Sequence, residues 1–433
     1  MKDSGVEWIG EIPEEWHVAK LKTVCNIYGR IGFRGYTVED LVSKDEGAIT
    51  LSPTNIVDNK LDLSKCTYIS WMKYEESPEI QIDNGDIILV KTASVGKCAI
   101  VEDVNTPMTI NPQFVVLKKI KANNKYLFYV VLSEVVQNAI KLDSVGGVIK
   151  TITQNNINNY KVTLPNMYMQ QCIADFLDVK VLDIDSAIER IKLVIEDYKK
   201  YKNSLITEAV TKGINHNIQM KQSEVTWNPM IPKHWNVITP KALFVQRKDK
   251  AIEGERQLTA SQKNGIMYQD EYMEQEGTRV VVVQKDFSIL KHVEPDDFVI
   301  SMRSFQGGLE YSTLSGCISS AYVMLIPNKD KVYPGFYRWF FKSSKYINAI
   351  QSTSNLVRDG QAMRYSNFAQ VPLFDIPYQE QVEIAEYLDK KIPEIDKLIS
   401  EKEELIKELE NYKKSLIYEY VTGKKEVPVE NVR

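Results

Sequence analysis

An internal repeat is the feature that most constrains the fold of this 433-residue chain. Residues 6–18 match residues 225–237 at two Trp, two Val and one Ile-Pro pair, without a gap. Residues 201–211 match residues 412–422 at eight of eleven positions, whereas the stretches between these matches diverge. At roughly 100–200 residues per domain the length predicts two to four domains. The repeat predicts four segments: variable bodies at 1–169 and 214–377, and shared segments at 170–213 and 378–433.

The shared segments carry apolar residues at alternating steps of four and three, which is typical of a coiled coil. In the first copy nine of ten stripe positions between 177 and 209 are apolar or aromatic, and in the second eight of ten between 388 and 420. Each stripe needs a partner, and the other helix supplies one within the same chain. We therefore expect an antiparallel coiled coil with pseudo-twofold symmetry, whose interface includes Ile184, Ile188, Ile191, Ile195, Leu205, Ile395, Ile399, Ile406, Leu409 and Leu416.

A proline in the second shared segment and a lysine in each stripe depart from the apolar pattern. Pro393 lacks a backbone N–H and is expected to end a short helix, so that a long helix begins at Glu394. Lys202 and Lys413 occupy equivalent stripe positions, where we expect their stems to pack and their ammonium groups to reach solvent.

The two bodies have the pattern of mixed helix and strand. Short β-rich runs occur at 86–91, 113–118, 280–284, 298–302 and 321–326, and turn residues separate them. One helix is expected near the end of each body, at 125–141 and 335–352. The predicted fold is therefore α/β (α+β): two globular modules joined by two long helices.

Composition sets further limits. Hydrophobic residues make up 43% and charged residues 26% of the chain, and no apolar run is long enough for a transmembrane helix. The N-terminus has no apolar signal core, and five scattered cysteines predict reduced thiols in the cytoplasm rather than a zinc ribbon or disulfides. The net charge of -4 disfavours nucleic acid. However, residues 378–433 carry 10 cations and 14 anions, whereas residues 214–377 carry 19 cations and 16 anions. The acidic excess therefore lies in the last helix segment and does not argue against DNA binding by the second body.

The layout and its motifs resemble the specificity subunit of type I restriction-modification systems (HsdS). The resemblance rests on the entry motif at 5–16, the helix entries at 170–178 and 380–389, and the helix ends at 201–213 and 412–423. It implies that each body is a target-recognition domain for one half of a split DNA site. It also implies that the helices set the spacer and dock two methyltransferase subunits (HsdM), which bind S-adenosylmethionine, and that motor-nuclease subunits (HsdR) join the full complex.

No motif predicts catalysis by this chain. Residues 110–114, Ile-Asn-Pro-Gln-Phe, differ by one residue from the box of amino-methyltransferases, but no glycine-rich cofactor loop accompanies them. Residues 94–97 end like a phosphate-binding loop, yet the opening glycine is replaced by Lys91. Residues 294–297 are expected to form a turn before a strand. The four histidines are dispersed, so we predict neither a metal site nor a cofactor in this chain.

Polar loops that follow buried strands are the candidate DNA contacts. They combine cations, small hydroxyl residues and glycine, which permit close approach to phosphates and bases. Asn and Gln can also pair bidentately with adenine. The candidates are Lys91, Thr92, Ser94, Lys97, Asn111, Gln113, Lys150, Arg303, Ser304, Gln306, Arg358 and Arg364.

We therefore expect a non-catalytic recognition subunit that binds double-stranded DNA, methyltransferase subunits and no membrane. The alternative is a self-contained DNA methyltransferase or nuclease with a duplicated recognition domain. A third hypothesis is a coiled-coil scaffold that never contacts DNA.

Overall fold

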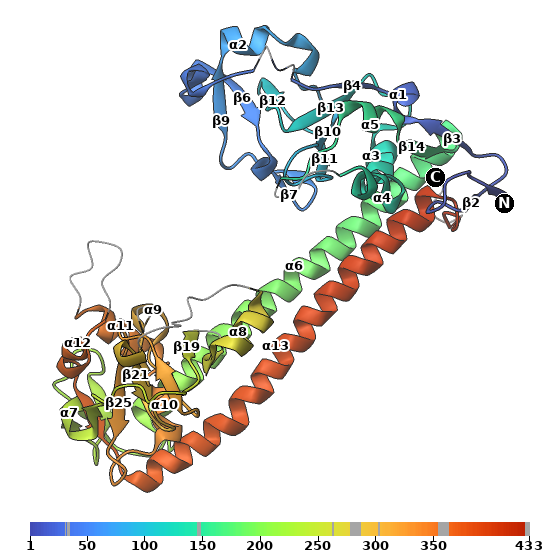
Figure 1. Ribbon diagram of the computed structural model, residues 1–433. Helices are drawn as coiled ribbons and strands as arrows, with labels where there is room; N and C mark the ends of the chain where they lie inside the picture. The colour runs from blue at the N-terminus through green and yellow to red at the C-terminus, as the bar shows by residue number, and fades with distance from the viewer. Residues whose placement is uncertain are drawn as a thin grey trace. The chain divides into compact units, whose positions relative to one another are not determined.

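The structure is a computed structural model that describes residues 1–428 except 31, 33–34, 145–148, 262–263, 278–286, 302–303 and 354–362. The chain forms two compact units (Figure 1). Unit 1 comprises Met1–Ile191 and Glu404–Arg433, and unit 2 comprises Lys192–Glu403. Both units contain helices and predominantly antiparallel sheets, so the fold is α+β. No helix in the described ranges is long and apolar enough to cross a membrane.

Unit 1 is built around a four-stranded antiparallel sheet in the order β11-β10-β13-β4. A second sheet, β12-β6-β9-β5, contains one parallel pair, β12 with β6. Strand pairs β1-β2, β3-β14 and β7-β8 complete the unit. The strands are β1 (Lys2–Asp3), β2 (Glu11–Ile12), β3 (His17–Lys20), β4 (Asn26–Tyr28), β5 (Leu41–Val42), β6 (Gly47–Leu51), β7 (Ile56–Val57), β8 (Lys60–Leu61), β9 (Thr67–Ser70), β10 (Ile87–Val90), β11 (Cys98–Ile100), β12 (Met108–Ile110), β13 (Phe114–Lys118) and β14 (Lys161–Leu164).

Unit 2 repeats the central sheet in the equivalent order β23-β22-β25-β18. The pairs β15-β16 and β17-β26 correspond to β1-β2 and β3-β14, so the repeat in the sequence extends to strand order. The strands are β15 (Met220–Gln222), β16 (Met230–Pro232), β17 (Asn236–Ile238), β18 (Phe244–Gln246), β19 (Leu258–Ser261), β20 (Gly265–Tyr268), β21 (Lys291–Val293), β22 (Phe298–Ile300), β23 (Glu310–Tyr311), β24 (Gly316–Ile318), β25 (Val323–Pro327) and β26 (Leu373–Asp375). The run predicted at 280–284 lies outside the described residues.

The helices follow the same duplicated plan. Unit 1 contains α1 (Leu21–Val24), α2 (Trp71–Glu75), α3 (Asn124–Leu132), α4 (Glu134–Asp143) and α5 (Gln154–Asn159). Unit 2 contains α7 (Pro240–Leu243), α8 (Gln269–Glu276), α9 (Ser304–Gly307), α10 (Pro334–Phe340), α11 (Ser344–Gln351) and α12 (Tyr365–Gln370). The long helices are α6 (Met167–Lys212) and α13 (Tyr378–Val421).

The single helix predicted near the end of each body was wrong, because each body has two helices there. In unit 1 the break falls at Ser133, whose extended backbone ends α3 and whose hydroxyl accepts a hydrogen bond from the Val135 N–H to cap α4. Ser343 takes the equivalent position before α11. Serine competes with the helical backbone for hydrogen bonds and favours helix N-caps, so the chain bends where the apolar period alone indicated continuity.

The core of each unit has its own composition. In β10, Ile87 and Leu89 face the cluster that includes α3 and α4, whereas Ile88 and Val90 face the second sheet. This alternation buries both faces of the strand. Unit 2 instead packs an aromatic cluster, in which the Phe244 ring lies 5.0 Å from Tyr337 and 5.3 Å from Phe341 between centroids.

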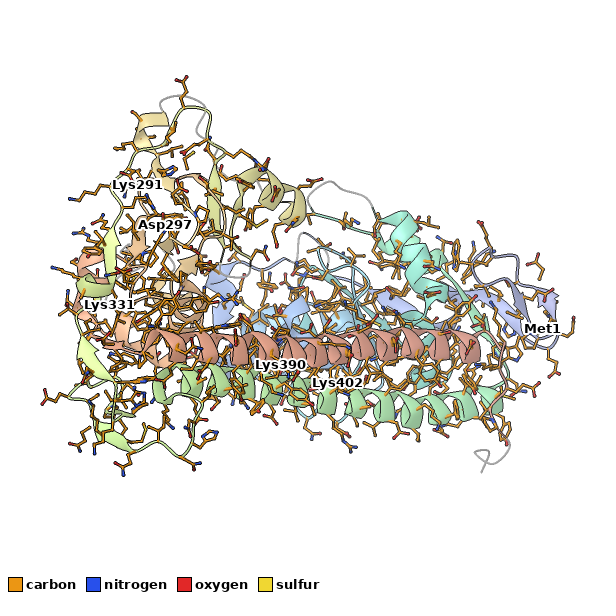
Figure 2. The ribbon with its side chains drawn as sticks, turned by 90° about the horizontal axis from the view of Figure 1, so that it is seen from below. Met1, Lys291, Asp297, Lys331, Lys390 and Lys402 are labelled. Atoms are coloured by element: carbon orange, nitrogen blue, oxygen red, sulfur yellow. The ribbon has the colours of Figure 1, made fainter. Side chains whose placement is uncertain are left out.

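The helices α6 and α13 pair antiparallel within each unit (Figures 1 and 2). In unit 1 the rings of Phe176 and Tyr420 lie 4.6 Å apart, and Lys413 contacts Asp185 at 2.6 Å. In unit 2 Lys202 contacts Asp396 at 2.6 Å, so both stripe lysines end in ion pairs. Of the predicted interface, Ile184, Ile188, Ile195, Ile395, Ile399 and Leu416 are buried, and Ile191, Leu205, Ile406 and Leu409 are half-buried.

The helix break predicted at Pro393 was wrong, because α13 runs through this residue. Proline removes one intrahelical hydrogen bond, but Pro393 is exposed here. Ile392 and Ile395 are both buried on the stripe. Packing on either side of the proline therefore outweighs the lost hydrogen bond.

Candidate nucleic-acid interface

Three segments of unit 1 that are distant in sequence meet at the end of strand β10. The Lys91 N–H donates to the Gln113 carbonyl at 2.7 Å, and the Ala93 N–H donates to the Lys150 carbonyl at 2.9 Å. The hydroxyls of Thr92 and Thr151 lie 3.1 Å apart. The structure thus brings the predicted residues Lys91, Thr92, Asn111, Gln113 and Lys150 into one cluster, which we call the β10 loop cluster.

The turn that carries Ser94 and Lys97 has an unusual backbone. Ala93 has a φ of 68° and Gly96 a φ of 93°, and only the glycine adopts such an angle without steric cost. A Cβ on Gly96 would lie 2.5 Å from Gln137 Oε1, and Gln137 donates to the Gly96 carbonyl. The turn is therefore fixed by α4 while the side chains of Ser94 and Lys97 remain exposed. No helix follows this turn, which excludes a phosphate-binding loop of the nucleotide-binding kind.

The side chain of Lys91 is half-buried, and no carboxylate lies within ion-pair distance of it in the described part of the chain. Burial lowers the pKa of its ammonium group, because the charged form has lost solvation without gaining a counterion. A phosphate group would supply that counterion. Among the residues of the β10 loop cluster, Lys91 therefore has the strongest electrostatic reason to contact an anion.

The box at 110–114 forms the turn between β12 and β13. The Asn111 Oδ1 accepts from the Gln113 N–H at 2.9 Å, and the Asn111 amide donates to Gln113 Oε1 at 3.1 Å. Asn111 is only 8% exposed. Its side chain thus shapes the turn, whereas the half-buried Gln113 lies at the edge of the β10 loop cluster.

The corresponding residues of unit 2 are only partly described. Arg303 and Arg358 lie outside the described residues, as does the side chain of Gln306. Ser304 is fully buried, and its hydroxyl accepts from the Ser301 N–H at 2.8 Å. A buried, bonded hydroxyl cannot reach DNA in this conformation, so Ser304 holds the loop in place. Arg364 is exposed at the start of α12.

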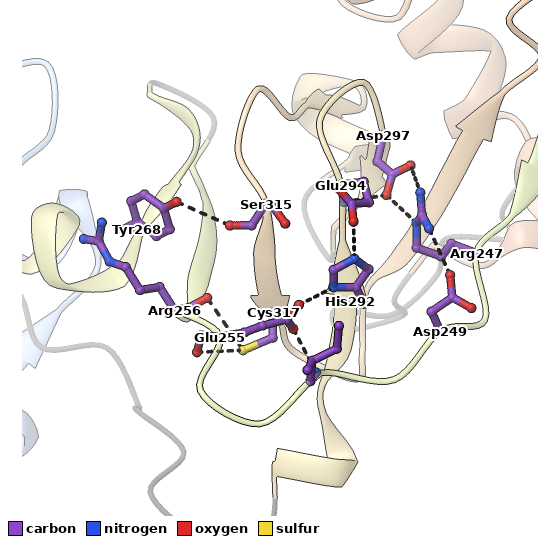
Figure 3. Close-up of polar contacts among 11 residues, drawn as sticks. Arg247, Asp249, Glu255, Arg256, Tyr268, His292, Glu294, Asp297, Ser315 and Cys317 are labelled. Carbon is purple, nitrogen blue, oxygen red and sulfur yellow. Dashed lines mark hydrogen bonds and ion pairs between the residues drawn. The ribbon is translucent and has the colours of Figure 1, made fainter.

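One of the four dispersed histidines, His292, contacts two carboxylates in unit 2. His292 Nδ1 lies 2.5 Å from Glu255 Oε1, and Nε2 lies 2.7 Å from Glu294 Oε1 (Figure 3). Burial by itself lowers the pKa of His292, but the hydrogen bond to Glu294 and the charge of Glu255 outweigh it and raise the pKa. When His292 is protonated, its ion pairs with Glu255 and Glu294 connect the 249–257 segment to β21. No cluster of metal ligands occurs in the described ranges.

The acidic run at 294–297 forms a turn before β22, as predicted. Arg247 makes a bidentate contact with Asp297, through Nε at 2.7 Å and Nη2 at 3.0 Å (Figure 3). Asp297 is 1% exposed and also accepts from the Glu294 N–H. These carboxylate oxygens are occupied by the protein itself.

A pair of buried glutamines, which sequence reasoning missed, joins each body to its long helix. Gln170 accepts from the Asn123 N–H at 2.9 Å and donates to the Pro165 carbonyl at 2.8 Å. Gln381 accepts from the Tyr333 N–H and donates to the Ile376 carbonyl, both at 2.8 Å. The two glutamines occupy equivalent positions of the repeat, so identity between the copies was the signal that could have revealed them.

A second duplicated contact lies two helical turns further along. Asp178 accepts from Lys125 at 2.6 Å and from the Tyr129 hydroxyl at 2.7 Å. The equivalent Asp389 contacts Arg338 and accepts from the Trp339 indole N–H at 2.8 Å. In both units an aspartate on the long helix therefore holds one cation and one aromatic donor from the body.

Residues 13–196 match the family model of the type I restriction modification DNA specificity domain. The match covers the first body and part of α6. The chain is also 26% identical over 431 residues to a putative type I restriction enzyme MjaX specificity subunit from Methanocaldococcus jannaschii, with 97% of this chain and 96% of that protein covered. It is 24% identical over 212 residues to the MjaVIII specificity subunit of the same organism, with 48% of each chain covered. The chain is thus similar, over nearly its whole length, to type I restriction-modification specificity subunits.

Solved structures show the same fold. One chain, from work on complex assembly and conformational transition of the type I R-M system, has a TM-score of 0.68 at 15% identity, and 96% of this chain and 100% of that chain are covered. The HsdS subunit from Thermoanaerobacter tengcongensis has a TM-score of 0.50 at 14% identity, with 96% and 98% covered.

Proposed function

We propose that this specificity subunit reads an asymmetric, bipartite DNA site, with one half-site assigned to each body. The supporting observation is that both units share one strand order and one set of body-to-helix contacts, whereas their loops differ in sequence. A common frame with different loops presents two different reading surfaces. Two linked readers also bind more tightly than either alone when the linker matches the span of their sites.

In this proposal cations position the DNA and loop side chains read it. Contacts to phosphates fix register and orientation, whereas contacts to base edges carry the sequence information. Lys91, Lys97 and Lys150 are the candidate phosphate contacts of unit 1, and Thr92, Ser94 and Gln113 are the candidates for reading bases. Arg303, Gln306, Arg358 and Arg364 are the candidates in unit 2.

We further propose that α6 and α13 form one antiparallel coiled coil between segments 1–169 and 214–377, and that it sets the spacer. The duplicated body-to-helix contacts would offer two equivalent docking sites for methyltransferase subunits. Val179, Leu182 and Leu193 are large apolar residues that α6 exposes, which suits partner contacts. The subunit itself would be non-catalytic, with S-adenosylmethionine bound by the methyltransferase partner, motor-nuclease subunits joining the complex, and the assembly working in the cytoplasm.

A module exchange tests this proposal. Residues 214–377 are replaced by the second body of another specificity subunit, and methylated sites are mapped across the genome of a host that also carries the partner methyltransferase. The expected result is a site with one half changed and the other half kept. A change in both halves would contradict the assignment of one half-site to each body.

Lengthening the helices tests the role of the coiled coil. One added turn in each long helix extends the pair by about 5.4 Å, which corresponds to between one and two base pairs at about 3.4 Å per base pair. The spacer should widen while both half-sites stay the same. An unchanged spacer would contradict the proposal that the coiled coil sets the spacer. Methylation by the isolated chain would contradict the proposal that this subunit is non-catalytic.

A further inference from the structure

A polar pocket of about 450 Å³ lies in unit 2, between the last turns of α6 and the beginning of α11. Lysine, hydroxyl and amide side chains line most of it. The residues that matter for its charge and shape are Lys200, Ser204, Thr207, Lys212, Ser344 and Lys345. The Thr207 and Ser344 hydroxyls lie 3.1 Å apart and connect the two helices across the pocket. One carboxylate, that of Glu208, also lines the pocket, so its lining carries a net positive charge.

The position of Lys345 is built into the fold. Its ammonium group donates to Asn228 Oδ1 at 3.0 Å, and Asn228 is 1% exposed and donates to the Thr211 carbonyl at 3.2 Å. Lys200 pairs with Asp197, and Lys212 with Glu208. In the described part of the chain, Lys345 has no carboxylate within ion-pair distance. Burial, and then the nearby Lys212, lower the pKa of Lys345, and the more weakly acting charge of Glu208 does not offset them.

The other copy of the repeat has no equivalent pocket chemistry. Tyr418 stands where the first helix has Thr207, and its hydroxyl donates to the Trp8 carbonyl at 2.7 Å. Glu134 and Val135 begin α4, where α11 begins with Ser344 and Lys345. One of the three differences between segments 201–211 and 412–422 therefore opens this space in unit 2. The other copy has Asn411, Gly423 and Val135 in place of Lys200, Lys212 and Lys345, so the cationic lining is also specific to unit 2.

The pocket is connected to the candidate reading loop of unit 2. Helix α11, whose first residues line the pocket, packs against α9, which begins with Ser304. The contact is tight, because a Cβ on Gly308 would lie 2.0 Å from the Phe341 carbonyl oxygen just before α11. A group bound in the pocket would thus sit on the same rigid helix that supports the loop.

We propose that this pocket binds a phosphate group of the DNA backbone beside the half-site that unit 2 reads. The inference rests on the proposed function for the assignment of a half-site to unit 2. A phosphate supplies the missing counterion of Lys345 and accepts hydrogen bonds from the hydroxyls of Ser204 and Ser344. Contacts of this kind position a protein on DNA without carrying sequence information.

The test measures the salt dependence of DNA binding by the subunit assembled with its methyltransferase partner. Lys345→Gln removes the unpaired cation. Thr207→Tyr fills the pocket with the residue that the other copy carries and leaves every lysine in place. Lys199→Gln is the matched control, because Lys199 is an exposed α6 lysine beside the pocket that does not line it.

Each phosphate contact contributes about 0.9 to the slope of log K against log salt. Both pocket variants should reduce the magnitude of the slope by about this amount. Their loss of affinity relative to wild type should therefore be about eightfold greater at 0.1 M salt than at 1 M salt. The methylated sequence should stay the same. Lys199→Gln should leave the slope unchanged. Slopes equal to that of the control in both variants would overturn the pocket assignment, although wild-type binding to a bipartite site would leave the proposed function intact.

A second arm separates a DNA phosphate from a free one. The ammonium resonance of Lys345 is followed by NMR during titration with inorganic phosphate and, separately, with duplex DNA in the assembled complex. The proposal expects duplex DNA to shift the resonance at concentrations where inorganic phosphate does not. A response to inorganic phosphate together with an unchanged salt slope for DNA binding would assign the pocket to a free anion and overturn the proposal. Failure of the Lys345→Gln subunit to assemble with the methyltransferase would also overturn it.

Discussion

Replacing the buried Gln381 by leucine should loosen the junction between α13 and the body of unit 2. The side chain is fully buried and of similar size to leucine, so the change mainly removes hydrogen bonds. It leaves the Tyr333 N–H and the Ile376 carbonyl without partners, whereas the Lys331 carbonyl belongs to an exposed residue that water can reach. At about 1–3 kcal/mol for each buried unsatisfied group, the local opening free energy should fall by about 2–6 kcal/mol.

Hydrogen exchange measured by mass spectrometry reports this loss segment by segment. Peptides from α10 and β26 should exchange at least about 30-fold faster in Gln381→Leu, because each 1.4 kcal/mol corresponds to about tenfold. Peptides from β10 and β13 of unit 1 should not change. Gln379→Leu is the control, since Gln379 is exposed one helical half-turn earlier. Equal exchange in the two variants would refute the reasoning that Gln381 fastens the body to its helix.

Three further predictions concern charge, pairing and the helix backbone. Because the pKa of His292 is raised above its ordinary 6.5, its stabilisation is complete below that pH and is lost as pH rises through the folded-state value. The urea midpoint of unit 2 should therefore fall from pH 6 to 8, and His292→Asn should flatten this dependence; an unchanged slope would count against the clamp. A double-mutant cycle should give a coupling of about 1 kcal/mol for Asp185 and Lys413, whose side chains are 20% and 16% exposed, and less for the more exposed Lys202 and Asp396. Equal couplings would contradict this ranking. Pro393→Ala should stabilise α13 by about 1–3 kcal/mol in thermal unfolding, because a helix-interior proline costs about 3 kcal/mol relative to alanine; a loss of stability would show that the proline is required.

Local sequence patterns were sufficient to predict the central strands but not the helix break at Ser133 or the burial of Ser304. The strands expected at 86–91 and 113–118 occur as β10 and β13, because uninterrupted runs of buried β-branched residues indicate strands. The helix predicted at 125–141 was divided at Ser133, where a capping hydrogen bond outweighed the apolar period. Ser304 was a reasonable DNA candidate by residue type, but its burial depends on packing that no local pattern reveals.

The sequence by itself determined the duplicated plan and the apolar stripes of both long helices, because these are carried by local periodicity and by identity between the copies. Only the tertiary structure decided which polar side chains are occupied. Gln381, Asp389 and Asp297 are bound within the protein, whereas Lys91 and Lys345 are half-buried cations without a carboxylate partner in the described ranges. Burial and pairing depend on contacts between segments far apart in the chain, and the free energy of a charge depends on those contacts more than on its neighbours in sequence.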